Sequence, residues 1–125
     1  MASTAEVELK IYKSVLSSMF PNHQVVHVWS DNPKIKKLFQ TIENIKIVSE
    51  QKDADILMLY KTKCKVPDKI IFIGNYALLK QCKDKAVGGF YWQKGRPNLL
   101  FLRENLKAHN IVLPKKLEEF IEGKI

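Results

Sequence analysis

The chain has 125 residues, a mass of 14.5 kDa and 46% hydrophobic residues, which suits one globular domain (residues 1–125) with one core. Its apolar runs, such as Ile56–Tyr60 and Ile70–Ile73, are far shorter than the roughly 18 residues of a membrane-spanning helix. Residues 1–4 carry neither the basic nor the apolar segment of a signal peptide and are expected to form a short leader outside the fold.

The formal net charge is +8, and 19 of the 21 basic residues are lysines. Lysine is a hydrated point charge, whereas the planar guanidinium of arginine suits bidentate recognition of bases and phosphates. This bias predicts no specific recognition of nucleic acid. Many lysines gather in residues 61–69 and 80–85. They form either a solvated face or an electrostatic docking surface for an acidic partner or an anionic membrane.

Strand and helix patterns alternate along the chain. Apolar spacing over Ile11–Phe20 predicts an amphipathic helix that stops before Pro21, and Asn32 followed by Pro33 predicts the start of a second helix. The expected elements after the first helix are a strand (24–29), a helix (33–42), strands (45–48, 56–60, 69–73), a helix (76–82), a hairpin (88–102) and helices (104–108, 115–121).

This alternation predicts an α/β fold: a three-layer sandwich with a mostly parallel central sheet and a C-terminal antiparallel hairpin. The hairpin pattern is a glycine pair (Gly88-Gly89), an aromatic strand and turn residues at Lys94–Pro97. One link fits poorly, because residues 61–68 are too few for a helical crossover. Either that link is an extended loop or the two strands that it joins are not parallel neighbours.

Ligands of parallel sheets bind beyond the carboxyl ends of the strands, and two expected loops lie there. Residues Ser30, Asp31 and Asn32 follow the first strand, and Asn75 follows the strand at 69–73. Both loops lead into helix N-termini, whose free N–H groups favour anions. Neither loop has a glycine-rich phosphate-binding pattern, so the same residues also fit a purely structural capping role.

No catalytic constellation is apparent. The three histidines lack the spacing of metal ligands, and His27 alternates with Val26 and Val28 as a structural histidine in a strand would. No nucleophile or zinc-protease motif occurs. The sequence therefore predicts a protein without enzymatic activity, cofactor or metal.

The two cysteines leave two readings open. Cys64 lies in the loop that must return along the sheet, and Cys82 lies at the end of the helix at 76–82, so both can reach the same edge. A disulfide between them is geometrically feasible, and free thiols in a reducing compartment are the alternative.

Four segments, taken in order, resemble the YfiR-like family of small periplasmic regulatory proteins. They are ELKIYKSVLSSMFP, DKIIFIGNYALL, AVGGFYWQKGRPNLLFL and RENLKAHNIVLPKKLEEFI, and the resemblance runs in this order over about the whole length of the chain. The resemblance implies a non-enzymatic periplasmic regulator, commonly a homodimer, that binds and restrains a membrane-bound signalling enzyme such as a diguanylate cyclase. The family's cysteines lie at other positions than Cys64 and Cys82, so no redox role carries over.

The same resemblance implies an interaction surface at Trp92, Lys94 and Arg96. A turn selected only for folding needs Gly95 and Pro97, whereas this one adds two cations beside an aromatic edge. Two other functions stay open. One is a module for a small ligand or anion that resembles half of a periplasmic binding protein and uses the loops described above. The other is a cytoplasmic nucleic-acid binder, which only the net charge favours.

Overall fold

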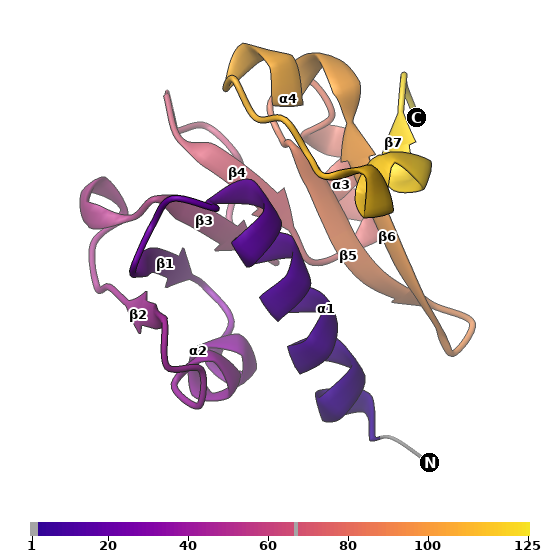
Figure 1. Cartoon of the computed structure of the whole chain (residues 1–125). Helices are drawn as coiled ribbons and strands as arrows, with labels where there is room; N and C mark the ends of the chain where they lie inside the picture. The colour runs from indigo at the N-terminus through magenta and orange to yellow at the C-terminus, as the bar shows by residue number, and fades with distance from the viewer. Residues whose placement is uncertain (1–2, 67) are drawn as a thin grey trace.

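The structure, a computed structural model, describes residues 3–66 and 68–125. Within these residues one sheet has the strand order β2-β1-β3-β4-β5-β6-β7 (Figure 1). Its strands are β1 (Val26–Ser30), β2 (Ile45–Ile47), β3 (Ile56–Leu59), β4 (Ile70–Ile73), β5 (Gly88–Gln93), β6 (Arg96–Leu102) and β7 (Ile121–Glu122). All neighbouring pairs are parallel except the β5–β6 hairpin. The predicted α/β class, with a mostly parallel sheet and a C-terminal hairpin, is confirmed.

Helices cover both faces of the sheet, which gives three layers (Figure 1). The α-helices are α1 (Thr4–Met19), α2 (Pro33–Phe39), α3 (Tyr76–Gln81) and α4 (Arg103–Ala108), and the 3₁₀ helices are η1 (Gln51–Asp53) and η2 (Lys115–Phe120). Buried residues of α1, α2, α4 and η2 share one core with one face of the sheet. The buried residues of α3 belong to a second core on the other face.

The strand order creates a switch point between β1 and β3. From β1 the chain moves to β2 on one side, and from β3 onward it moves in the opposite direction through β4 and β5. Right-handed crossovers therefore place α2 and α3 on opposite faces. In doubly wound sheets the crevice beyond the carboxyl ends of such diverging strands is the usual place for a ligand.

Tyr12 of α1 lies at the centre of the larger core. It is 1% exposed, and its ring centroid lies 5.2 Å from that of Phe39, 5.4 Å from Phe90 and 6.3 Å from Phe72, each in edge-to-face geometry. These partners come from α2, β5 and β4. One aromatic cluster thus joins the N-terminal helix to both halves of the sheet.

The short link between β3 and β4 is an extended loop, and the two strands are parallel neighbours. This resolves the alternatives that the sequence left open. Cys64 and Val66 of the loop pack against the smaller core, on the same face as α3. The loop therefore covers part of the sheet where a doubly wound fold usually has a helix.

Two predicted helices differ from the observed ones. The helix at 33–42 ends at Phe39, and residues 41 and 42 instead donate i→i−3 hydrogen bonds to Leu38 and Phe39, which keep Ile42 buried. The last helix is 3₁₀ rather than α, which suits the three-residue spacing of Leu117 and Phe120. In both segments the sequence predicted a helix but not the type of its turns.

We predict that Gly88→Ala destabilises the fold strongly. A Cβ at Gly88 would lie 2.3 Å from the carbonyl oxygen of Leu100 in the paired strand, so the hairpin backbone would have to shift. We expect a loss of about 2–3 kcal/mol in the free energy of unfolding, measured by urea denaturation. Gly123→Ala is the control, because its Cβ would meet only Arg103 at an ordinary 3.7 Å. Equal midpoints for the two variants would refute this account.

Candidate functional site

The predicted site residues fall into two groups in the structure. Ser30, Asp31, Asn32 and Asn75 lie where β1 and β4 end, beside the switch point. Trp92, Lys94 and Arg96 lie on the outer part of the β5–β6 hairpin, which extends beyond the other strands (Figure 1). The structure brings the residues of each group together and places the two groups in different parts of the fold.

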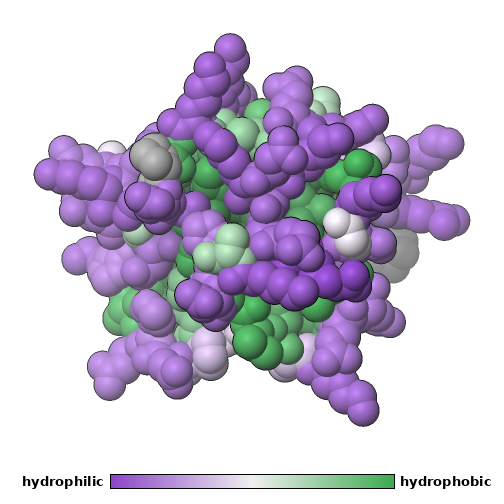
Figure 2. All heavy atoms as spheres, turned by 90° about the horizontal axis from the view of Figure 1, so that it is seen from above, coloured by the Kyte–Doolittle hydropathy of each residue, from purple (hydrophilic) through white to green (hydrophobic). Residues whose placement is uncertain are grey.

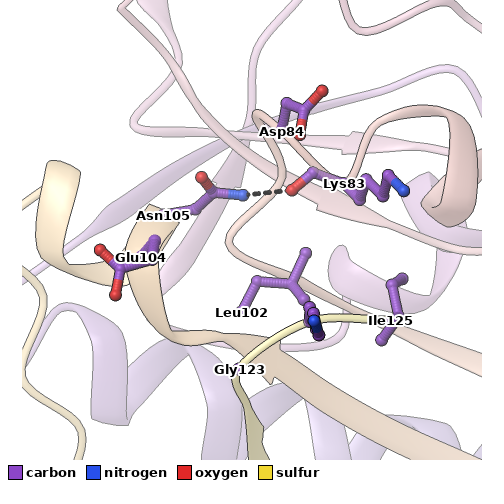
Figure 3. A pocket seen from close by; sticks show the side chains of 8 residues that line it. Lys83, Asp84, Leu102, Glu104, Asn105, Gly123 and Ile125 are labelled. Atoms are coloured by element: carbon purple, nitrogen blue, oxygen red, sulfur yellow. Dashed lines mark hydrogen bonds between the residues drawn. The ribbon is translucent and has the colours of Figure 1, made fainter.

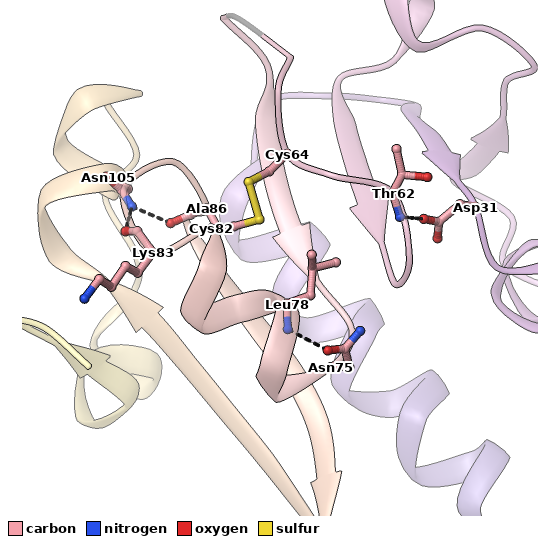
Figure 4. Close-up of a disulfide and its surroundings, with 9 residues drawn as sticks. All are labelled: Asp31, Thr62, Cys64, Asn75, Leu78, Cys82, Lys83, Ala86 and Asn105. Carbon is pink, nitrogen blue, oxygen red and sulfur yellow. Dashed lines mark hydrogen bonds between the residues drawn. A yellow bond between two sulfur atoms is a disulfide. The ribbon is translucent and has the colours of Figure 1, made fainter.

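At the switch point, the Asp31 carboxylate occupies the donors that an anionic ligand would use. It accepts hydrogen bonds from the backbone N–H groups of Tyr60 at 2.8 Å, Lys61 at 2.9 Å and Thr62 at 2.6 Å (Figure 4 shows the Thr62 bond). Burial by itself raises the pKa of Asp31, but the hydrogen bonds outweigh it and hold the pKa below its ordinary value. The chain thus supplies its own anion to this nest of N–H groups.

The other polar residues of this group also bind within the chain. The Ser30 hydroxyl accepts the Asn32 N–H at 3.1 Å, and Asn32 Oδ1 caps α2 through the N–H of residue 34 at 2.9 Å. Asn75 Oδ1 caps α3 through the Leu78 N–H at 2.7 Å (Figure 4), and its Nδ2 donates to the Tyr60 carbonyl. This geometry matches the structural capping role, which was one of the two predicted alternatives.

Two tyrosines, Tyr12 and Tyr60, meet beside the switch point. The sequence alone did not predict a role for either of them. The phenol groups of Tyr12 and Tyr60 hydrogen-bond to each other, and burial raises the pKa of both. The Tyr60 ring also fills the space beside Gly74, where a Cβ would lie 2.0 Å from a ring carbon. The one available signal was that a buried phenol needs a polar partner, which does not identify the partner.

The hairpin presents aromatic and cationic groups together. Trp92 Nε1 donates to Glu8 Oε1 of α1 at 2.7 Å, and its ring lies edge-on to Phe90 at 5.9 Å, yet Trp92 stays 37% exposed. Lys94 and Arg96 are exposed on either side of Gly95, and Lys94 and Gly95 have positive φ angles of 51° and 75°. We call Trp92, Lys94 and Arg96 the hairpin surface.

A second pair of aromatic rings supports the opposite face of the hairpin. Tyr76 at the start of α3 is 37% exposed, and its ring centroid lies 5.1 Å from that of Tyr91 in β5. Burial raises the pKa of Tyr91. Aromatic rings thus pack on both faces of the hairpin, Tyr76 with Tyr91 on one face and Phe90 with Trp92 on the other.

The two cysteines form a disulfide, which was one of the two predicted alternatives. Cys64 of the β3–β4 loop is bonded to Cys82 at the C-terminal cap of α3, with Cα atoms 6.0 Å apart (Figure 4). Asn105 Nδ2 fixes the following turn by donating to the carbonyls of Lys83 and Ala86 at 2.7 Å each. The loop, α3 and α4 are thereby tied to one another.

His27 has structural contacts, as predicted. The backbone N–H of His27 donates to Asp55 Oδ2 at 2.8 Å, and the ring Nδ1 of His27 lies 3.1 Å from the same oxygen. His23 Nε2 is farther, 3.9 Å from Asp55 Oδ1. Over residues 3–66 and 68–125, no three His, Cys, Asp or Glu side chains are grouped so that they could hold a metal ion.

A polar pocket lies beside α4 and the C-terminus. Its volume is about 340 Å³, and it is lined by Lys83, Asp84, Leu102, Glu104, Asn105, Gly123, Lys124 and Ile125 (Figure 3). Charges of both signs and the hydrogen-bonded Asn105 leave no single ligand charge favoured.

Seen from above, hydrophilic side chains project around smaller apolar areas (Figure 2). In the described part of the chain no helix is long and apolar enough to cross a membrane.

The chain matches no protein-family model and no curated protein.

We predict that the disulfide adds about 3 kcal/mol to the free energy of unfolding, since it closes a loop with a sequence separation of 18. A reducing agent should therefore lower the melting temperature of the wild-type chain. The matched control is the double variant Cys64→Ser/Cys82→Ser, whose melting temperature should be low and insensitive to reductant. Thiol labelling of the oxidised, denatured wild type that modified both cysteines would contradict the bond.

We predict that Asp31→Ala lowers the free energy of unfolding by about 1 kcal/mol at neutral pH, because three N–H groups of a partly solvated loop lose their acceptor. The pKa of Asp31 is lower in the folded than in the unfolded chain. Its contribution is therefore complete above the unfolded-state pKa and is lost as the pH falls through the folded-state pKa.

Urea denaturation across this range checks the prediction, with the exposed Asp84→Ala as the control. A difference between wild type and Asp31→Ala that did not shrink on acidification would contradict the role of the carboxylate.

Proposed function

We propose that this protein is a non-enzymatic regulatory protein that binds a protein partner through the hairpin surface. The observation that carries the proposal is the position of Trp92, which is hydrogen-bonded to Glu8 yet 37% exposed, beside two exposed cations on an extended hairpin. Tryptophan and arginine are the residues most often found at the energetic centre of protein interfaces.

The geometry favours tight recognition with little ordering cost. The Glu8 hydrogen bond and the Phe90 ring hold the Trp92 side chain in one orientation before any partner arrives. A preoriented aromatic side chain loses less entropy on binding than a free one. Lys94 and Arg96 would steer an acidic partner surface toward this anchor.

The disulfide supports a location in an oxidising compartment, because such bonds persist mainly in exported proteins. This agrees with the periplasmic location that the resemblance to YfiR-like proteins implies. On that basis we propose that the partner is a membrane-bound signalling enzyme, such as a diguanylate cyclase, which this protein restrains. The resemblance also implies a homodimer. In this proposal two copies would associate through the hairpin surface.

The alternative, an anion-binding module at the strand ends, has less support. The donors at the switch point already bind the Asp31 carboxylate, and the amide of Asn75 binds Tyr60 and Leu78. An incoming anion would have to displace a carboxylate that is covalently part of the chain. The hairpin surface requires no such displacement.

We predict that Arg96→Glu weakens partner binding about tenfold or more and leaves folding unchanged, because Arg96 is exposed and its charge faces solvent. The experiment is a binding titration with the purified sensor part of a membrane-bound diguanylate cyclase from the same organism, paired with thermal melts. Arg103→Glu is the matched control: it makes the same charge change at an exposed position on α4. Equal binding by both variants, or a collapse in the melting temperature of Arg96→Glu, would count against the hairpin surface.

A further inference from the structure

A second surface, separate from the hairpin surface, is an apolar groove between α1, the β5–β6 hairpin and η2. Its volume is about 410 Å³, within the range of about 300–1,000 Å³ that small-molecule sites occupy. Val15 and Phe90 form its floor and are 0% and 2% exposed, whereas Ile11, Leu99 and Phe120 are half-buried along its sides. The groove is thus an indentation in the larger core that reaches solvent.

Only two polar side chains line the groove, and both come from α1. Lys10 and Ser14 are four residues apart, so they lie on one face of the helix, one turn from each other. Lys10 is the only ionisable lining residue, and no ion pair found over residues 3–66 and 68–125 involves it. A cation and a hydroxyl donor therefore stand at one side of an otherwise apolar groove.

The backbone beside the groove is unsuited to binding an added strand. The N–H of Leu102 donates to Val87 on the β5 side, so the alternate residues 97, 99 and 101 direct their backbone groups outward. Pro97 has no N–H, and Phe101 is already paired with β7. Leu99 alone keeps a free outward donor and acceptor, so side chains rather than backbone determine what this groove binds.

We propose that the groove binds a free aliphatic carboxylate. Its hydrocarbon chain lies on the floor formed by Val15 and Phe90, and its carboxylate binds the Lys10 ammonium and the Ser14 hydroxyl. The charge supports an anionic head group, because the lining has one cation and no carboxylate. The lining residues support an aliphatic body, because the groove is otherwise apolar and has no further donors for a polar one. This site does not depend on the proposed partner.

The test is isothermal titration calorimetry of the full chain with decanoate below its micelle concentration, with decylammonium as the ligand of opposite charge. We expect decanoate to bind and decylammonium not to. Lys10→Glu should weaken decanoate binding about tenfold or more, because it removes a charge-assisted hydrogen bond. Lys13→Glu makes the same charge change at an exposed position outside the groove and should bind as the wild type does.

A second variant, Ser14→Leu, fills the groove with a good helix former and should abolish decanoate binding while the melting temperature holds or rises. Absence of decanoate binding to the wild type, equal binding of both ligands, or equal effects of Lys10→Glu and Lys13→Glu would overturn the proposal. So would undiminished binding by a folded Ser14→Leu chain. A concentration-dependent dimer in sedimentation that Ser14→Leu abolishes, with no decanoate bound, would assign the groove to a second copy instead.

Discussion

The link between β3 and β4 is too short to hold a crossover helix, and several contacts elsewhere in the structure hold this link in place. A face of the sheet that lacks a covering helix must be covered by irregular chain, whose backbone groups need partners. Here Asp31 binds three N–H groups where the loop begins, the Cys64–Cys82 disulfide holds its middle, and Lys69 Nζ donates to the Lys52 and Ala54 carbonyls where it ends. Polar and covalent ties thus replace the packing that a helix would have supplied.

The loop and the groups that hold it occupy the place where a doubly wound sheet usually binds its ligand. The loop begins at the carboxyl end of β3, beside the switch point, so the groups that secure it are the groups a ligand would need. Tyr60 closes the same place by packing over Gly74 and bonding to Tyr12. The surfaces that remain available for binding therefore lie elsewhere, toward the C-terminal side of the sheet.

Features encoded by neighbouring residues could be predicted from the sequence. The hairpin followed from Gly88-Gly89 and the turn at Lys94–Pro97, and the strand and helix order followed from local periodicity. Contacts between distant residues could not be predicted. The Glu8–Trp92 hydrogen bond joins residues 84 apart, and the Tyr12–Tyr60 bond joins residues 48 apart. Nothing local to Asp31 distinguished a carboxylate that binds a distant loop from one that caps a helix or faces a ligand.

Both proposed binding surfaces have one structural origin, the uneven end of the sheet. β7 pairs with β6 only at Phe101 and Leu102, so on the side away from β5 the outer half of β6 has no neighbouring strand. The short η2 helix covers only part of the hairpin face next to α1, which leaves the groove, and the hairpin tip extends beyond the other strands (Figure 1). α1 contributes to both surfaces through different faces, because Glu8 holds Trp92 while Lys10, two residues on, lines the groove. Residues two apart on a helix point in different directions, so a change at Lys10 leaves the Glu8–Trp92 hydrogen bond in place.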